Sequence, residues 1–303
     1  MKFISADFLN SILHSDKNHI KPDFMIIGTQ KGGTTSLYKY ISKHPNFLRG
    51  HFNKEKEIQF FSCYYPEGLK WYEKNFPTVK EKELTERKLQ SKIITGEAST
   101  TYLFFPLCPK RIFQYKKDLK LIVMLRNPVY RAFSAYSYYV MHKQLQNPDY
   151  KVISFENFFL RESLEEHTTF ELFFMHQSKK TYNRSIIDGC LHDHLAYLNL
   201  KNSKYVEQLK NWFEYFPKEQ FLFIKSEDFF QNPQNTFKDV CQFLEIPEIE
   251  PDKYTVENKG PDSNYKNLNQ STKLFLADYF EPYNQELYKL LNRDFNWYEE
   301  TVR

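Results

Sequence analysis

The stretch from Ile26 to Pro45, IIGTQKGGTTSLYKYISKHP, carries residue types that bind phosphate. An apolar strand ends at Gly28, and small and hydroxyl-bearing residues follow it at the start of a helix. Successive N–H groups and the dipole of that helix can hold one phosphate group. A lysine in the middle of the loop can neutralise the bridging oxygen of that phosphate. The predicted binding residues are Lys31, Gly32, Gly33, Thr34, Thr35 and Ser36.

The spacing of this loop differs from that of an ATP-binding loop. The pattern G-x-x-x-x-G-K-[ST] requires a lysine directly after Gly33, but Thr34 occupies that position. Because the lysine lies inside the loop, the strict ATP motif fails. A structural interpretation stays open, in which the two glycines form a turn and Thr34 to Ser36 only begin a helix.

A second segment, LIVMLRNPVYRAFSAYSYY, places Arg126 at the end of a strand and Ser134 on the helix that follows. This layout can bind a second phosphate at the carboxyl edge of a parallel sheet. Taken alone, the segment is better interpreted as a surface arginine and a helix serine. The two segments together favour a ligand with two phosphate groups.

Short apolar runs and capping residues indicate the elements that position these side chains. Strands are predicted over Asp23–Gly28, Lys92–Gly96, Leu119–Arg126 and Phe221–Lys225. Helices are predicted over 34–44, 127–144 and 203–216, with two further helical pieces in 271–297 broken at Pro282. Strands that alternate with helices favour an α/β fold: a single P-loop-like domain with a central parallel β-sheet flanked by helices. We assign residues 22–303 to this domain and residues 1–21 to an N-terminal extension.

The composition of the 303 residues limits the class of protein. The chain is 41% hydrophobic and 18% aromatic, which is typical of a folded domain. Its net charge of +4 is too balanced to indicate bulk binding to nucleic acid or membrane. We find no apolar run long enough to span a membrane and no signal sequence. The four cysteines are scattered without a metal-ligand spacing, so we expect thiols, no metal and a cytoplasmic location.

The segments TQKGGTTS and RNPVYRAFSAY together resemble the sulfotransferases that use 3′-phosphoadenosine 5′-phosphosulfate (PAPS). The resemblance is closest to the heparan sulfate N- and 3-O-sulfotransferase branch. Weaker similar segments follow in the family's order over 22–297, among them KEIQFF, GEASTTYLF and NKG. The resemblance implies the sulfotransferase fold, with PAPS as sulfate donor and 3′-phosphoadenosine 5′-phosphate (PAP) as product, and no metal.

The same resemblance assigns roles to individual residues. The loop around Lys31 would hold the 5′-phosphosulfate, and the lysine would stabilise the leaving phosphate. Arg126 and Ser134 would hold the 3′-phosphate. Lys259 and Gly260 match a late basic loop that closes over the cofactor, although such a pair is more often a surface turn.

An acceptor hydroxyl also needs a general base. The family's glutamate before a Phe-Phe pair corresponds to Glu57 in KEIQFF. Without the resemblance, NKEKE would be interpreted as a solvated run of charges. His142 is the second candidate for the base, although a lone helix histidine is more often structural.

The chain also departs from the glycosaminoglycan enzymes. Ala98 follows Glu97 where those enzymes carry a lysine, and no cysteine follows Cys241 to form their cysteine pair. These departures argue against a heparan-like polyanion as acceptor. We expect a glycan, a lipid or a small natural product that bears a hydroxyl or an amine.

Two other functions compete with this interpretation. One is a P-loop kinase or another nucleotide triphosphatase, which the displaced lysine weakens. The other is a non-catalytic nucleotide-binding or scaffold protein that retains the fold. A preference for PAP over ATP would separate the first interpretation from the second.

Overall fold

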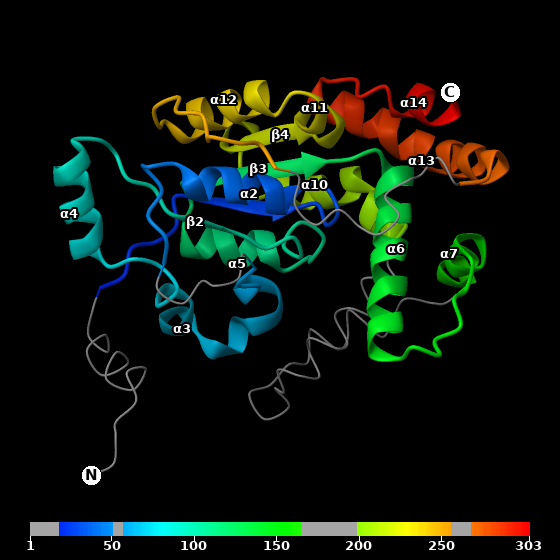
Figure 1. Ribbon diagram of the computed structural model, residues 1–303, viewed down its shortest axis with the longest axis horizontal. Coiled ribbons are helices and arrows are strands. Elements are labelled where there is room, and N and C mark those ends of the chain that lie inside the picture. Colours follow the sequence, from blue (N-terminus) through cyan, green and yellow to red (C-terminus); the bar gives the residue numbers. More distant parts are fainter. Residues whose placement is uncertain (1–17, 51–56, 165–198, 256–267) are drawn as a thin grey trace, which may run out of the picture.

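The computed structural model describes residues 18–50, 57–164, 199–255 and 268–303 (Figure 1). Four parallel strands form a sheet in the order β2-β1-β3-β4. Their bounds are β1 Phe24–Gly28, β2 Gly96–Ala98, β3 Lys120–Leu125 and β4 Phe221–Lys225. The parallel sheet confirms the predicted α/β class, and three of its strands lie within one residue of their predicted bounds.

Helices cover both faces of the sheet and extend beyond both ends of its strands (Figure 1). Their bounds are α2 Thr34–Lys43, α3 Leu69–Glu73, α4 Val79–Leu89, α5 Cys108–Tyr115, α6 Pro128–Gln146, α7 Phe155–Leu164, α10 Tyr205–Phe213, α11 Ser226–Gln231, α12 Pro233–Leu244, α13 Gln270–Leu291 and α14 Trp297–Val302. Single π or 3-10 turns lie at Phe60–Tyr64, Tyr65–Glu67, Lys201–Ser203 and Lys218–Gln220.

The alternation of side chains along the strands builds two hydrophobic layers. One face of β1, with Met25 and Ile27, packs in a cluster with Trp212 of α10 and Ile112 of α5. The other face carries Phe24 and Ile26, which share a second cluster with residues of α2 and α12. Because both faces of the sheet are covered, β1 and most of β3 and β4 are apolar, as is usual for parallel sheets, whereas β2 carries the buried Glu97.

Strand β2 lies later in the chain than Lys92–Gly96, the strand that we predicted. Ile94 makes only an isolated bridge to Phe47, whereas Gly96 pairs with Phe24 of β1. A Cβ atom at Gly96 would lie 2.5 Å from an atom of the Phe24 ring. The close approach of the two strands therefore requires glycine at this position, and the apolar residues before it belong to the core beside the strand.

Helix α13 is continuous through Pro282, so the predicted break was wrong. The proline removes one backbone hydrogen bond, to the carbonyl of Asp278. Both residues are exposed, which lets water satisfy that carbonyl. Leu276 and Leu287 are buried on either side of the proline, and their packing keeps the two halves in one helix.

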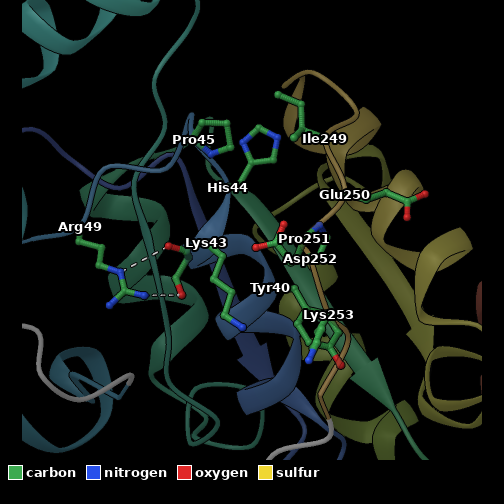
Figure 2. A pocket seen from close by; sticks show the side chains of 11 residues that line it. Tyr40, Lys43, His44, Pro45, Arg49, Ile249, Glu250, Pro251, Asp252 and Lys253 are labelled. Atoms are coloured by element: carbon green, nitrogen blue, oxygen red, sulfur yellow. Dashed lines mark hydrogen bonds between the residues drawn. The ribbon is translucent and has the colours of Figure 1, made fainter.

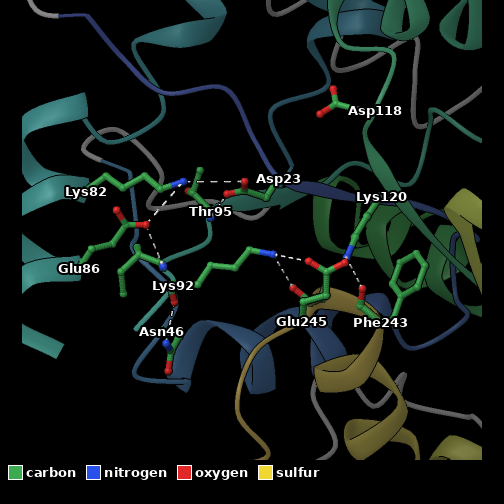
Figure 3. A network of polar contacts seen from close by, with 12 residues as sticks. Asp23, Asn46, Lys82, Glu86, Lys92, Thr95, Asp118, Lys120, Phe243 and Glu245 are labelled. Carbon is green, nitrogen blue, oxygen red and sulfur yellow. Dashed lines mark hydrogen bonds and ion pairs between the residues drawn. The ribbon is translucent and has the colours of Figure 1, made fainter. Parts of the chain in front are cut away.

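A network of polar contacts links the amino ends of the strands to the residue after α12 (Figure 3). Lys120 at the start of β3 and Lys92 before β2 both contact Glu245, with N–O distances of 2.7 and 2.8 Å. These two lysines hold the pKa of the Glu245 carboxyl down at about 2. The opposite, carboxyl edge is left for the phosphate loop.

Helix α6 begins at the carboxyl edge and runs away from the sheet (Figure 1). Asn127 caps it by accepting a hydrogen bond from the N–H of Val129 at 3.1 Å, and Pro128 occupies the first turn, as predicted. Beyond the sheet, the ring of Phe133 meets Phe155 of α7 at 5.4 Å. This contact supports the part of α6 that carries the site residues.

Two observations on the described residues concern the expectations about membrane spans and cysteines. No helix among them has both the length and the apolarity to cross a bilayer. Cys63, Cys108 and Cys241 are buried free thiols, whereas Cys190 lies outside the described residues.

Candidate active site

The phosphate loop connects β1 to α2. Gly33, at φ 96°, precedes the helix and offers no side-chain cap, so the N–H groups of the first turn face the loop. A Cβ atom at Gly33 would lie 2.7 Å from the ring of Phe230. Lys31 is also left-handed, at φ 68°. The loop therefore has a turned backbone of the kind that can surround an anion, and anion binding itself stays a prediction.

The ends of two neighbouring strands hold this backbone in place. Arg126, directly after β3, donates from Nη1 to the carbonyl oxygen of Lys31 at 3.0 Å. Ser226, directly after β4, donates from Oγ to the carbonyl oxygen of Gly32 at 2.7 Å. The structure thus brings Arg126 to the loop, as its position at a strand end suggested. These two hydrogen bonds fix the carbonyl groups of Lys31 and Gly32 and so hold the loop in its turned conformation.

Helix α6 lies across from the loop and contacts Lys31. The Lys31 ammonium lies 4.3 Å from the centre of the Tyr138 ring, and the Tyr138 hydroxyl is 2.8 Å from Nε2 of His142. Ser134 lies one turn before Tyr138, so these three α6 residues share one face of the helix. Burial, together with the charge of Glu57, raises the pKa of Tyr138. The lysine, the histidine and the glutamate therefore meet around one tyrosine.

Glu57 is half-buried beside the turn that follows β2. Thr100 donates from Oγ1 to both carboxylate oxygens, at 3.4 and 3.3 Å. Gln59 donates from Nε2 to Oε2 at 3.2 Å. These contacts hold the Glu57 carboxylate in one place and do not fit a freely solvated side chain at this position. They leave its role as a base a prediction.

The remaining predicted residues differ in exposure. Thr34 and Ser36 are buried, and Thr35 is half-buried on the first turn of α2. Ser134 is 7% exposed. The late basic loop with Lys259 and Gly260 lies outside the described residues.

Two residues of the site were missed by sequence reasoning. Tyr138 lies four residues after Ser134 and four before His142, a helical spacing that could have indicated it. Ser226 follows the last predicted strand, and a hydroxyl at a carboxyl strand end could have been noted in the same way as Arg126.

A separate cleft of about 730 Å³ opens at the other end of α2 (Figure 2). That end is about 15 Å from Thr34, given the rise of an α-helix. Arg49 donates there to the carbonyl and hydroxyl oxygens of Ser42, at 3.4 and 3.0 Å. His44 is 2.9 Å from the carbonyl oxygen of Pro247. The cleft carries charges of both signs and does not belong to the phosphate loop.

A family model described as "Sulfotransferase domain" matches residues 21–275. The chain belongs to the sulfotransferase family. The match confirms the resemblance first noted in the segments TQKGGTTS and RNPVYRAFSAY. A P-loop kinase, the alternative interpretation, is not supported by it.

The chain is also similar in sequence to individual sulfotransferases. "Membrane-associated sulfotransferase kil1" of Dictyostelium discoideum is 31% identical over 91% of the chain and 66% of its own length. "Heparan sulfate glucosamine 3-O-sulfotransferase 3A1" of Mus musculus is 27% identical over 91% of the chain and 64% of its own length. The chain thus spans less than two thirds of each relative.

A solved structure shows the same fold. The crystal structure of a sulfotransferase from Alicyclobacillus acidocaldarius superposes with a TM-score of 0.62 at 25% identity, covering 92% of this chain and 99% of that one. The sheet and helices described above are therefore the sulfotransferase fold.

Proposed function

We propose that this chain transfers a sulfuryl group from PAPS to a hydroxyl or amine of a glycan, a lipid or a small molecule. The observation that carries the proposal is the position of Lys31. Its ammonium projects from the middle of the loop toward α6, and Arg126 fixes its backbone. This position supports a role for the Lys31 ammonium as the cation that meets the bridging oxygen between phosphate and sulfate.

The loop fits the phosphosulfate end of PAPS. A Cβ atom at Gly32 would lie 2.9 Å from the carbonyl oxygen of Met124, so glycine is needed where the backbone turns most tightly. The donors nearby are N–H groups, the Thr35 hydroxyl and the Lys31 ammonium. A single lysine and a helix N-terminus can offset the charge of one phosphate without a metal.

The residues divide the work of an in-line transfer. PAPS supplies the sulfuryl group when it is bound. Glu57 takes the proton from the acceptor as the new bond to sulfur forms. Lys31 stabilises the charge that grows on the bridging oxygen as its bond to sulfur breaks, and PAP leaves. Arg126 and Ser134 hold the 3′-phosphate.

We favour Glu57 over His142 as the base. Thr100 and Gln59 donate to Glu57, which keeps its carboxylate oriented as an acceptor. His142 already lies within hydrogen-bond distance of Tyr138. The histidine is better suited to orienting the tyrosine or the acceptor.

The acceptor is proposed to be other than a heparan-like polyanion. Ala98, fully buried at the end of β2, stands where the glycosaminoglycan enzymes carry a lysine. Without that cation the site has less attraction for a highly sulfated chain. Neutral glycans, lipids and small hydroxyl- or amine-bearing compounds remain as the proposed classes.

We also propose a cytoplasmic location. Support comes from the cysteines, since Cys63, Cys108 and Cys241 are free thiols that suit a reducing compartment. Fractionation of cells that express the tagged chain would test this location. Recovery from the membrane or secreted fraction would contradict it.

A screen of acceptor classes with ³⁵S-labelled PAPS tests the function. Transfer of label to a neutral glycan, lipid or small molecule is expected, with Lys31→Ala as the blank. Transfer only to heparan sulfate would overturn the acceptor class and keep the activity. A chain that neither transfers label nor binds PAP would overturn the activity itself.

A further inference from the structure

Glu97 of β2 is a fully buried carboxylate held by four donors. Its Oε1 accepts from the hydroxyls of Tyr72 and Tyr102, at 2.5 and 3.1 Å. Its Oε2 accepts from the Ser99 hydroxyl at 2.6 Å. The backbone N–H of Ile58 also donates to the carboxylate. A buried charge is tolerated only when its hydrogen bonds are satisfied in this way.

Two of these contacts reach the segment that carries the proposed base. Ile58 follows Glu57 directly, and the N–H of the next residue, Gln59, donates to the Ser99 hydroxyl at 2.9 Å. Ser99 therefore accepts from Gln59 and donates to Glu97. Gln59 is held in the left-handed region, at φ 54°, which costs free energy unless its surroundings fix it.

The same strand end supports Glu57 from the side. Thr100, which donates to the Glu57 carboxylate, follows Ser99 in the turn after β2. Glu97 thus organises both the backbone after Glu57 and the turn whose hydroxyl contacts it. Full burial keeps Glu97 itself away from any acceptor.

Among the described residues that surround Glu97, the Glu97 carboxyl is the group whose pKa lies near neutral pH. Burial raises its pKa to about 7. Burial also raises the pKa values of the surrounding hydroxyls and thiol: Tyr72 of α3, Tyr102 of the turn, Tyr38 of α2, and Cys108 and Tyr115 of α5. These neighbours stay neutral across the pH range in which Glu97 takes up a proton.

We propose that Glu97 is a positioning residue for Glu57, acting through the backbone N–H groups of Ile58 and Gln59. The inference rests on the proposed function, in which Glu57 is the base. When Glu97 is protonated, one of its oxygens carries a hydrogen and accepts hydrogen bonds poorly. One of the four donors then loses its acceptor, and the hold on the backbone of Ile58 and Gln59 weakens. Glu97 must then be ionised for full turnover.

The first test needs no acceptor. Hydrogen–deuterium exchange of the peptide that contains Ile58 and Gln59 is compared between wild type and Glu97→Gln. The amide can accept at one atom only, so the exchange of these two N–H groups is expected to rise at least tenfold. Unchanged exchange would overturn the proposal.

The second test uses turnover with labelled PAPS and the best acceptor from the screen. Glu97→Gln is expected to lower kcat about 10- to 100-fold, because small misplacements of a base are costly, and to leave PAP affinity within about twofold. The variant should also lose the rise of kcat through neutral pH that Glu97 causes in wild type. Tyr72→Phe removes a donor that favours the charged form, so it should shift that rise to higher pH without lowering the plateau.

The outcomes separate the two proposals. If Glu57→Gln turns over at the wild-type rate, Glu57 is not the base, whatever Glu97 does. If Glu57→Gln is inactive while Glu97→Gln keeps wild-type kcat and pH profile, Glu97 has no positioning role. A thermal melt of Glu97→Gln guards against unfolding, since removal of a buried charge should not lower its stability at pH 8.

Discussion

The ammonium of Lys31 lies 4.3 Å from the centre of the Tyr138 ring. A contact of this kind contributes about 0.5–2 kcal/mol. It holds the half-buried lysine toward α6, yet it is weak enough to yield to a phosphate. The loop after β1 and helix α6 are thus linked before any ligand binds.

Lys31→Ala should remove turnover. Loss of one preorganised donor to the leaving oxygen is expected to lower kcat by about 10²- to 10³-fold. Loss of a charged hydrogen bond should weaken PAP binding by about 10- to 100-fold. Lys39→Ala, which removes an exposed lysine from the same helix region, is the matched control. Equal losses in both variants, measured by titration and label transfer, would show that only net charge matters.

Two substitutions of Tyr138 distinguish the role of its ring from the role of its hydroxyl. Tyr138→Leu removes the surface beneath Lys31 and should lower kcat by about tenfold, with PAP affinity little changed. Tyr138→Phe keeps the ring and loses only the hydrogen bond to His142, so its kcat should stay near wild type. The reverse order of the two rates would assign the function to the hydroxyl.

Glu57→Gln should spare PAP binding and lower kcat by about 10²- to 10⁴-fold, as expected for a general base. The amide preserves the shape of the side chain but cannot take the proton. Glu67→Gln, an exposed change a short way along the chain, serves as the control. Full activity of Glu57→Gln in the label-transfer assay would direct attention to His142.

Stability should fall as the pH rises toward neutrality. The pKa of Glu97 is about 7 in the folded protein against 4.5 for an ordinary glutamate. The folded state therefore holds the proton more tightly, and this contribution is present below pH 4.5 and lost as the pH rises through 7. Its loss should lower the free energy of unfolding by about 3 kcal/mol.

Urea unfolding at pH 5 and pH 8 measures this change, with Glu97→Gln as the variant that lacks it. Glu245, with its pKa near 2, titrates below this range and does not interfere. If the difference in free energy of unfolding between wild type and Glu97→Gln is the same at pH 5 and pH 8, the expected loss of stability with rising pH is contradicted.

Much of the fold could be predicted because its strands are short, buried apolar runs. β1, β3 and β4 followed their sequence pattern closely. β2 did not, because the residues that pair, Gly96–Ala98, include a buried glutamate. Its charge is satisfied by hydroxyls of Tyr72 and Tyr102, which nothing in the local sequence indicates.

The break predicted at Pro282 failed for a related reason. Local chemistry argued for a helix end, but packing on both sides of the proline outweighed one lost hydrogen bond at an exposed position. Tertiary contacts decided the outcome in both cases.

The site was partly predictable. The spacing of Lys31 within its loop and of Arg126 at a strand end indicated both residues, and in the structure the Arg126 guanidinium donates to the backbone carbonyl oxygen of Lys31. The contacts of Glu57 with Thr100 come from segments that are distant in sequence, so only the fold could reveal them. The roles of these residues stay predictions.

Calorimetric titration with PAP and with ATP, with and without magnesium, tests the central claim most directly. PAP should bind about 10- to 100-fold more tightly than ATP, since a second charged phosphate site is filled only by its 3′-phosphate. Its affinity should not change when magnesium is removed. Equal affinity for ATP, or a requirement for magnesium, would contradict the account.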